Sequence, residues 1–291
     1  MKQLGLKQFL RKYPNDDACL EEIFKKKYPN GVFCIRCQKV TAHFRRKERT
    51  SYSCTWCRHQ VFPLVGTIFE KSSTPLRLWF YAIFLVIKTR SGISAKQLER
   101  ELGVCYKTAH RMFKVIRKRM GETGSGGKLH GTVEVDETFI GGDGHNRRYV
   151  PHFNEKPKDI VMGMLERNGR VIPRHIATTG KIALMKEIQE HVDTDAYILT
   201  DQFPAYTNLH KYGYAHNMIN HRETYVIKGT DLHTNSIEGF WSNFKRGLYG
   251  VYRHCDSKYL QSYANEYAWR YNNRQLGDGM FDALLMRVIA S

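Results

Sequence analysis

The sequence predicts an α/β domain in its second half, preceded by a basic region with a metal-binding ribbon and a pair of helices. Three observations lead to this fold class. Strand-like and helix-like patterns alternate after residue 131, which is typical of an α/β layer arrangement. Two tight cysteine pairs in the first half have the spacing of a zinc site. The net positive charge is confined to residues 1–130, which indicates a separate role for that half.

The charge distribution divides the chain of 291 residues. Residues 1–130 contain 27 Lys and Arg against 9 Asp and Glu, whereas residues 131–291 contain 19 of each. Such an excess in one half indicates a polyanionic partner for that half. The hydrophobic content of 42% is that of a folded protein, and it excludes wholesale disorder.

No membrane segment or export signal is expected. The longest apolar run, residues 78–87, is too short for a bilayer, which takes about 20 residues. Residues 1–20 carry charges throughout, unlike a secretory signal. We therefore expect a cytoplasmic protein without a membrane partner, in a reducing compartment where a disulfide framework is disfavoured.

Residues 1–30 form the expected N-terminal helical segment, with a helix over 16–27 that Asn15 caps. Residues 31–72 are expected to form a zinc ribbon. The cysteines follow the pattern C-x2-C-x16-C-x2-C, and they are Cys34, Cys37, Cys54 and Cys57. Four thiolates leave no open position for a substrate, so one structural Zn²⁺ is expected. The alternative is two unrelated redox or buried pairs.

Aromatic and basic side chains alternate around these cysteines, which suits a ribbon that touches nucleic acid. They include Phe33, Phe44, Tyr52 and Phe62 with Arg45, Arg46, Lys47, Arg49 and Arg58.

Residues 73–120 predict a helix-turn-helix DNA-binding region. A strongly apolar helix over 76–88 is expected in the core. A second helix over 94–102 begins at Ser94, with Gln97 completing a capping box, and a short turn leads into a basic helix over 106–120. The DNA-binding side chains expected on this last helix are Lys107, Thr108, His110, Arg111 and Lys114. The alternative is a basic helical hairpin that only packs on its neighbour.

Residues 121–130 (GETGSGGKLH) read as a linker, and residues 131–291 as one α/β domain. The expected order is a strand over 132–140, strands over 160–166 and 171–177 joined through Asn168-Gly169, a helix over 182–192, a strand over 196–200, a helical stretch over 203–212, a strand over 215–220 and a helix from about residue 235. Three strands in hairpin order followed by helix, strand, helix, strand and helix is the order that a ribonuclease H-like sheet requires.

The helix expected within residues 233–250 is amphipathic, and Asn235 or Ser236 is its expected N-cap. Its apolar stripe consists of Ile237, Phe240, Trp241, Phe244 and Leu248, of which Trp241 and Phe244 are interpreted as core residues. Glu238 lies off this stripe, and Lys245 follows two turns later on the same face. The alternative is a surface helix with one spaced charge pair. The aromatic run over 259–271 predicts another helix, packed on the sheet.

Three carboxylates are candidates for a metal site: Asp136 on the first strand, Asp201 at a strand end, and Glu238 on the late helix. Strand ends line the ligand crevice of such sheets, so the three are expected to converge. An all-oxygen site suits Mg²⁺ or Mn²⁺, and two such ions assist phosphodiester chemistry. The alternative is that three of the domain's 19 acids align by chance.

Several motifs resemble the ISXO2-like insertion-sequence transposases of the IS1595 group. They are VEVDETFIGG, LTD at 199–201 and HTNSIEGFWSNFKRGLYG at 233–250, together with the cysteine ribbon, VGTIFEKSSTPL at 65–76 and YLQSYANEYAWRYNNR at 259–274. The resemblance covers nearly the whole chain.

The resemblance implies a catalytic triad with the spacing D-x64-D-x36-E, formed by Asp136, Asp201 and Glu238 around two Mg²⁺ or Mn²⁺ ions. It also implies that Lys245 is an accessory basic residue. Lys245 and Arg246 are the DNA-binding candidates of this helix. The third ligand varies within the group, so Asn235 and His233 remain alternatives to Glu238.

The implied reaction is metal-assisted hydrolysis at the transposon ends, followed by attack of the freed 3′-hydroxyl on target DNA. Double-stranded DNA, as terminal inverted repeats and as target, would be the partner, bound by a homodimer or larger assembly at a bacterial nucleoid. Two other readings remain: a zinc-ribbon and helix-turn-helix regulator with an inactive nuclease-like domain, and a structure-specific nuclease or resolvase.

Overall fold

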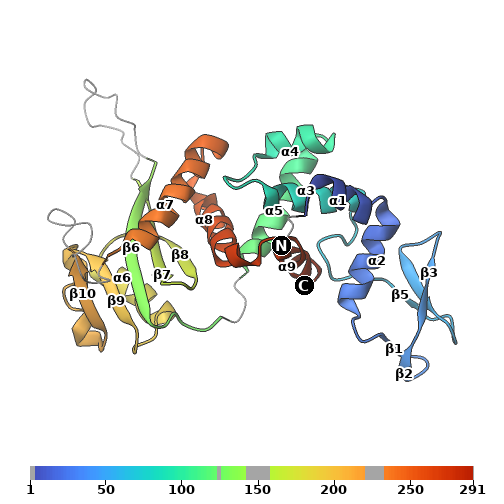
Figure 1. The fold of residues 1–291 in the computed structure, drawn as a ribbon, viewed down its shortest axis with the longest axis horizontal. Coiled ribbons are helices and arrows are strands. Elements are labelled where there is room, and N and C mark those ends of the chain that lie inside the picture. The colour runs from blue at the N-terminus through green and yellow to red at the C-terminus, as the bar shows by residue number, and fades with distance from the viewer. Residues whose placement is uncertain (1–3, 123–125, 142–157, 220–232, 291) are drawn as a thin grey trace. The chain divides into compact units, whose positions relative to one another are not determined.

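The computed structural model describes residues 4–122, 126–141, 158–219 and 233–290. The chain forms two compact units: residues 1–120 with 276–291 make the first unit, and residues 121–275 make the second (Figure 1). The change of unit at residue 121 falls where the linker is expected. Residues 276–291 differ from the expectation of one domain over 131–291, because they pack in the first unit. No helix in the described ranges combines the length and apolar character needed to cross a membrane.

The first unit has an aromatic core between helices. The helices are α1 (Leu6–Lys12), α2 (Asp16–Lys27), α3 (Leu76–Lys88), α4 (Ala95–Leu102), α5 (Tyr106–Gly121) and α9 (Gly279–Ile289). The helices expected over 16–27 and 76–88 are confirmed to the residue. Phe281 of α9 lies 5.9 Å from Phe9 and 6.1 Å from Phe80, between ring centroids. These contacts explain why the C-terminal helix belongs to the first unit.

The turn between α4 and α5 forms as expected, but the capping box is only half present. The Ser94 hydroxyl accepts a hydrogen bond from the Gln97 N–H at 3.1 Å. The Gln97 side chain donates to Glu101 at 2.6 Å instead of returning to Ser94. Gly103 ends α4 with a φ of 63°, in the left-handed region that glycine adopts at low cost.

The cysteine pairs lie in two small antiparallel sheets of the first unit. One contains β1 (Val32–Cys34) and β2 (Lys39–Thr41), and the other contains β3 (His43–Arg46), β4 (Ser51–Cys54) and β5 (Gln60–Val61) in the order β3-β4-β5. Tyr52 of β4 stacks on Phe24 of α2 with ring centroids 3.8 Å apart. This contact holds the strand against the helix.

The second unit contains a five-stranded mixed sheet. Its strands are β6 (Thr132–Ile140), β7 (Asp159–Glu166), β8 (Val171–Ile176), β9 (Tyr197–Asp201) and β10 (Ala215–Ile219). They lie in the order β8-β7-β6-β9-β10. The first three pair antiparallel, whereas β9 and β10 run parallel to β6. The expected hairpin at Asn168-Gly169 is confirmed. The stretch expected to be helical over 203–212 forms two 3-10 turns, η1 (Pro204–Tyr206) and η2 (Leu209–Tyr212).

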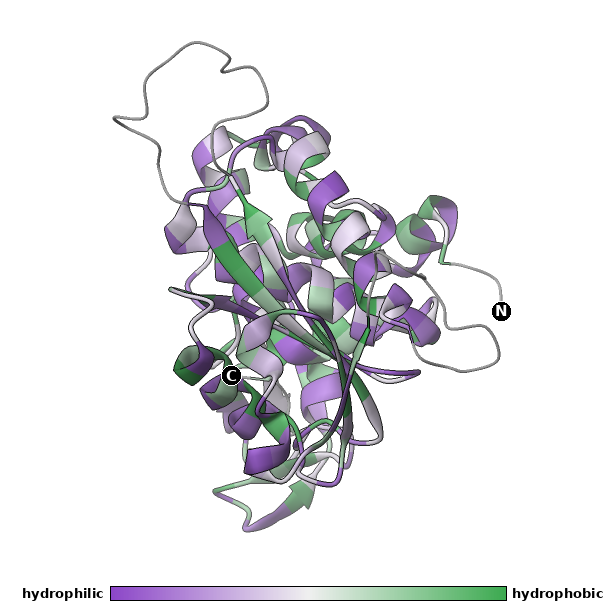
Figure 2. Cartoon of the chain, turned by 90° about the vertical axis from the view of Figure 1, so that its left-hand side faces the viewer, coloured by the Kyte–Doolittle hydropathy of each residue, from purple (hydrophilic) through white to green (hydrophobic). Residues whose placement is uncertain are grey.

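Helices cover both faces of this sheet. They are α6 (Lys181–His191) on one face, and α7 (Asn235–Gly247), its π-helical extension η3 (Leu248–Tyr252) and α8 (Ser257–Asn272) on the other, with the 3-10 turn η4 (Arg274–Leu276) after α8. Apolar residues line the strands between these layers (Figure 2). Side chains of a strand alternate between faces, so Val133 and Val135 of β6 contact the α6 layer. Residues 134, 136 and 138 therefore face α7.

Candidate active site

Asp136 and Asp201 lie on neighbouring strands where those strands diverge. β6 pairs with β9 only at Thr132, Val133 and Glu134, the last opposite Leu199. Continuing this parallel register by two residues sets Asp136 opposite Asp201. Asp201 ends β9 and accepts a hydrogen bond from the Phe203 N–H at 3.0 Å. Asp136 lies in the middle of β6 rather than at its end, yet it is the second residue past the β9 pairing, so both carboxylates reach the opening between the strands.

Helix α7 brings Glu238 to the same place. The Ile237 N–H near the start of α7 donates to Glu134 of β6 at 2.9 Å. Further along, the Gly141 N–H after β6 lies 3.5 Å from the Tyr249 hydroxyl. The helix therefore runs along β6 in the same direction, and Trp241 Nε1 donates to Asp136 Oδ2 at 3.0 Å between these points. Trp241 is a core residue as expected, and this bond also orients the carboxylate.

Gly163 makes room for Trp241. It is the cross-strand partner of Asp136 on β7, and a Cβ there would lie 2.6 Å from Trp241 Cζ2. We expect Gly163→Ala to lower the free energy of unfolding by about 1–3 kcal/mol, because overpacking displaces the indole. The same shift would break the bond to Asp136. Gly239→Ala is the control, since within the described ranges no atom outside the backbone of its own helix and its chain neighbours lies within 4 Å of its added Cβ, and it is expected to be neutral or stabilising. Urea denaturation measures both, and equal stability of the two variants would contradict this packing.

Negative charge accumulates at this point of the sheet. Burial, and then repulsion from the Asp201 carboxylate, raise the pKa of Asp136 to about 6, with Glu238 adding to the rise and the Trp241 hydrogen bond opposing it. The charges of Asp201 and Glu238 thus both act on Asp136. The folded protein thus keeps Asp136 where its ionised form is unfavourable. Such a residue is a functional-site candidate, because a bound cation would offset the repulsion between the carboxylates.

Glu137 is a fourth acid at this site. Its side chain lies on the opposite face of β6 and accepts a hydrogen bond from the Tyr206 hydroxyl. Burial, and then the charges of Asp136 and Asp201, raise the pKa of Glu137 to about 8. Glu137 was not among the candidates selected from the sequence, although its position directly after Asp136 was a signal.

Glu134 supports the start of α7 and was not among the candidates selected from the sequence. It is fully buried and accepts hydrogen bonds from the Ile237 N–H and from Arg167 Nε, the latter at 2.8 Å. Thr234, the N-cap of α7, makes no side-chain capping bond, so Glu134 supplies the acceptor that the helix start lacks. The expected cap at Asn235 or Ser236 is therefore wrong. The available signal was a second acid two residues before Asp136, on the same strand face.

The alternative third ligands are placed differently from Glu238. His233 Nδ1 lies 3.1 Å from Arg167 Nη2 and 3.4 Å from the Asn235 N–H. Glu134 Oε1 lies 3.6 Å from the same nitrogen. Asn235 is exposed as the first residue of α7.

The basic residues of α7 lie beyond the carboxylates. Lys245 is half-buried and Arg246 is exposed, with Arg246 Nη2 donating to Asn243 at 2.7 Å. Seven residues separate Glu238 from Lys245, which is about 10 Å along the helix axis. The two side chains therefore share a face without forming a pair.

Three groups of described residues have candidate ligand atoms all within 4.8 Å of one another, and the carboxylate triad is not among them. They are the four cysteines, His130 with Asp193 and Asp195, and Glu187 with Glu190 and His191. The charges of Asp201 and Glu238 act on Asp136, but the oxygens of the three carboxylates do not all lie within 4.8 Å of one another. The residues of the second and third groups are exposed or half-buried.

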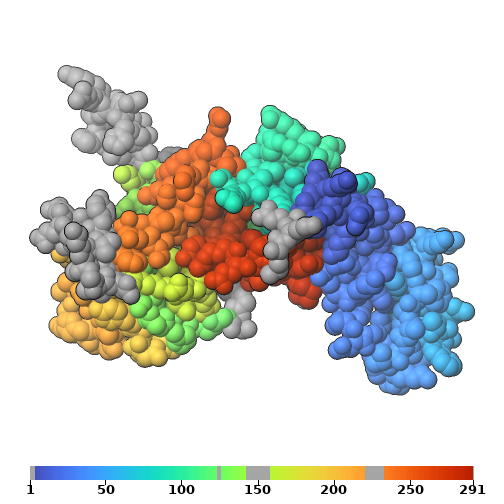
Figure 3. All heavy atoms as spheres, in the orientation of Figure 1, coloured from blue at the N-terminus to red at the C-terminus, as the bar shows by residue number. Residues whose placement is uncertain are grey.

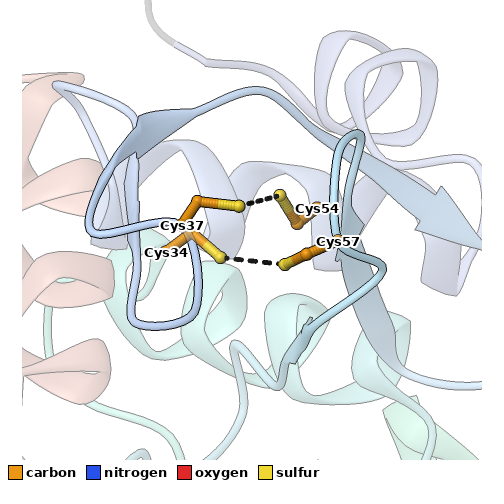
Figure 4. Close-up of side chains that lie close together, drawn as sticks. All are labelled: Cys34, Cys37, Cys54 and Cys57. Atoms are coloured by element: carbon orange, nitrogen blue, oxygen red, sulfur yellow. Dashed lines mark hydrogen bonds between the residues drawn. The ribbon is translucent and has the colours of Figure 1, made fainter.

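The four cysteines converge on one point (Figure 4). Cys34 Sγ lies 3.4 Å from Cys57 Sγ, and Cys37 Sγ lies 3.8 Å from Cys54 Sγ. A tetrahedral ion with Zn–S bonds of about 2.3 Å requires sulfurs about 3.8 Å apart. Burial opposes ionisation of Cys54, but hydrogen bonds from Thr41 and from the Cys57 and Trp56 N–H groups lower its pKa to about 5. The positions of the four sulfur atoms and the lowered pKa of the Cys54 thiol fit a four-coordinate zinc ion.

Helix α5 carries a row of exposed basic side chains. Lys107, His110, Arg111, Lys114 and Lys118 are all exposed, at the spacing of one helix face. Arg111 also donates to the Thr74 hydroxyl at 3.1 Å. Thr108 is half-buried, and its hydroxyl lies 3.3 Å from Cys105 Sγ. Of the five expected DNA contacts, Lys107 and Lys114 are exposed, whereas Arg111, Thr108 and His110 also make local contacts, the last with the Tyr106 ring at 5.8 Å between centroids.

Comparisons with known proteins match most of the second unit to a transposase domain. The ISXO2-like transposase domain model matches residues 128–272. An uncharacterised protein in the transposable element ISH50 of Halobacterium salinarum is 27% identical over 240 residues, which cover 76% of this chain and 79% of that protein.

Two solved structures are similar at a low level. The catalytic core domain of BIV integrase has a TM-score of 0.32 and 18% identity, covering 53% of this chain and 93% of that chain. A pre-cleavage Mos1 transpososome has a TM-score of 0.23 and 12% identity, covering 68% of this chain and 78% of that chain. Scores this low do not establish a common fold, so the assignment rests on the sequence matches. Through residues 128–272, the chain belongs to the ISXO2-like transposase family.

Proposed function

We propose that this protein is a DNA transposase that binds transposon ends, cleaves them with divalent metal ions and joins the freed strand to target DNA. The observation that carries the proposal is the charge coupling of Asp136 to both Asp201 and Glu238, within a domain of a transposase family. The strand order, three antiparallel strands followed by two parallel ones, supports a ribonuclease H-like catalytic domain.

Asp136 and Asp201 would hold a metal ion between their strands, and Glu238 would complete the site from α7. The donor set fits Mg²⁺ or Mn²⁺, because the three side chains offer only carboxylate oxygens. When bound, two such ions activate the attacking oxygen and stabilise the leaving one. Glu238 is favoured over His233 as third ligand because its charge acts on Asp136, whereas His233 Nδ1 is engaged by Arg167.

The remaining side chains of the site would bind and orient the DNA. Lys245 would bind a phosphate about two helical turns from Glu238, as a point charge. Trp241 fixes the Asp136 carboxylate through its indole N–H. Glu134 holds the start of α7 on β6 and so sets the position of Glu238 relative to Asp136.

The first unit would supply most of the DNA affinity. The exposed basic row of α5 would contact the duplex, with Lys107, His110 and Lys114 reaching bases or phosphates. Because two ends must be joined to one target, a homodimer or larger assembly on DNA is proposed.

We also propose that the four cysteines bind one structural zinc ion. Cys57→Ser is expected to lose the bound metal and to lower the melting temperature of the first unit, because the free energy of metal binding to the four thiolates contributes directly to folding. Metal analysis and calorimetry measure both quantities. Cys105→Ser is the control, since this exposed cysteine lies outside the cysteine group. A Cys57→Ser protein that retains a full equivalent of zinc would contradict the assignment.

Cleavage and joining of a labelled duplex with the element's ends, in Mg²⁺ or Mn²⁺, test the proposed function. Wild type is expected to cut and join, while Asp201→Ala and Glu238→Gln bind the same DNA and do neither. If Glu238→Gln stays active, the third ligand is His233 or Asn235. If wild type binds tightly and never cuts with either metal, the protein is a DNA-binding regulator.

A further inference from the structure

The ribbon exposes large apolar side chains that its own fold does not require. Trp56 is 73% exposed, and Ile35, Val40 and Phe33 are 61%, 59% and 55% exposed. Phe33 and Val40 are cross-strand partners on the outer face of β1 and β2. Ile35 and Trp56 lie in the two turns that carry the cysteine pairs. Single exposed apolar residues are common, but four on so small an element indicate an interaction surface.

The charge of the ribbon identifies the class of partner. Residues 32–61 contain seven Lys and Arg and a single acid, Glu48. Lys39 Nζ lies 4.7 Å from the centroid of the Trp56 ring, so a cation and an aromatic face stand together. Figure 3 shows this part of the chain, in light blue, as a lobe of the first unit. A basic surface interspersed with aromatic rings is complementary to a nucleic acid.

Hydrogen bonds fix the backbone of the turn that carries the exposed Trp56 ring. The Arg58 N–H donates to the Cys54 carbonyl at 3.2 Å, and the Thr55 N–H donates to the Ala42 carbonyl at 3.0 Å. The Trp56 N–H itself donates to the Cys54 sulfur, which is one reason for the low pKa of that thiol. All these bonds use backbone donors, so they persist when the indole is removed. A backbone ordered before binding reduces the entropy that is lost when the ring engages a ligand.

We propose that Trp56, with Lys39 beside it, is a base-stacking site that binds an unpaired nucleotide of DNA. A base offers its flat face only when it is unstacked, so an aromatic face selects unpaired or frayed positions rather than the interior of a duplex. Lys39 would attract the neighbouring phosphate. This inference rests on the proposed function, because strand cleavage creates DNA ends whose terminal bases can unstack.

The test measures binding of the full-length, zinc-loaded protein to two DNAs without Mg²⁺ or Mn²⁺, so that nothing is cleaved. One is a blunt duplex, and the other is the same duplex with a short single-stranded tail. Trp56→Ala is expected to lower the affinity for the tailed DNA about 5- to 100-fold, the range for one stacked base, and to leave the blunt duplex within about twofold. Trp56→Phe should restore most of the loss. The salt dependence should not change, since no charge is removed.

Lys107→Ala is the matched control, because it removes one charge of the α5 row. It should weaken both DNAs alike and reduce the slope of log affinity against log salt by about 1. Zinc content must equal that of wild type in every variant. The proposal is overturned if Trp56→Ala binds the tailed DNA as wild type does, or weakens both DNAs equally. It is also overturned if the variant changes only self-association or binding to anionic vesicles. Failure of wild type to cleave DNA would remove the transposase chemistry and leave this binding result intact.

Discussion

Asp136→Asn is expected to abolish DNA cleavage and, in protein without Mg²⁺ or Mn²⁺, to raise the free energy of unfolding above pH 6. Loss of a ligand between two strands should reduce cleavage by about 10³-fold or more, since metal stabilisation of the transition state supplies several kcal/mol. The Asn side chain keeps an oxygen for the Trp241 N–H, so the fold is preserved.

The stability change follows from the direction of the pKa shift. Folding raises the pKa of Asp136 from 3.8 to about 6, so the folded state binds this proton more tightly than the unfolded state. The contribution of this group to the free energy of unfolding is therefore fully present below about pH 4, and it is lost as the pH rises to about 6. Asparagine carries no such penalty, and the gain at pH 8 is expected to be about 1–3 kcal/mol.

Urea denaturation at pH 5 and pH 8 measures this difference. The buffers should lack added divalent ions rather than contain a chelator, which would also strip the cysteines. Asp195→Asn is the control, because this carboxylate is 77% exposed and should change neither stability nor cleavage. If Asp136→Asn is less stable than wild type at pH 8, ionised Asp136 does not destabilise the folded state.

Glu134→Ala is expected to destabilise the second unit by about 3–5 kcal/mol, because Arg167 Nε would lose the buried carboxylate that accepts its hydrogen bond. The Ile237 N–H would also lose its acceptor, so α7 and Glu238 would shift relative to Asp136. We therefore expect the Mn²⁺ concentration needed for half-maximal cleavage to rise at least tenfold. Glu134→Gln keeps an acceptor for Ile237 and should recover much of the metal affinity.

Glu187→Ala is the control that distinguishes a loss of stability from a loss of the positioning of Glu238. Glu187 accepts from Arg174 Nε at 2.8 Å on the opposite face of the sheet, the same distance as the Glu134–Arg167 pair. It should cost stability without changing the Mn²⁺ requirement. If Glu134→Ala folds and shows the wild-type Mn²⁺ dependence, Glu134 does not position the site.

Much of the fold is predictable from sequence because its signals are local. The helices over 16–27 and 76–88 follow from caps and apolar spacing, and the β7–β8 hairpin follows from Asn168-Gly169. The ribbon follows from cysteine spacing. The placement of the C-terminal helix does not, because it depends on Phe281 fitting an aromatic core formed some 200 residues earlier, next to Phe80.

The three candidate carboxylates can be selected from the sequence, but the residues that support them cannot. Asp136 and Asp201 stand out by their place on strands, and Glu238 by lying off an apolar stripe. The roles of Glu134 and Gly163 depend on which face of β6 meets α7, a register that local patterns do not determine. Likewise, the N-cap of α7 was misplaced because its acceptor comes from a strand about 100 residues away.

The position of the metal ion tests the central claim most directly. Crystals of the full chain with a duplex of the element's end, soaked in Mn²⁺, would locate the ion by anomalous scattering. We expect anomalous density for Mn²⁺ between Asp136 and Asp201, with the Glu238 carboxylate within coordination distance of the ion. Density held by His233 or Asn235 in place of Glu238, or none at the two aspartates, would contradict it.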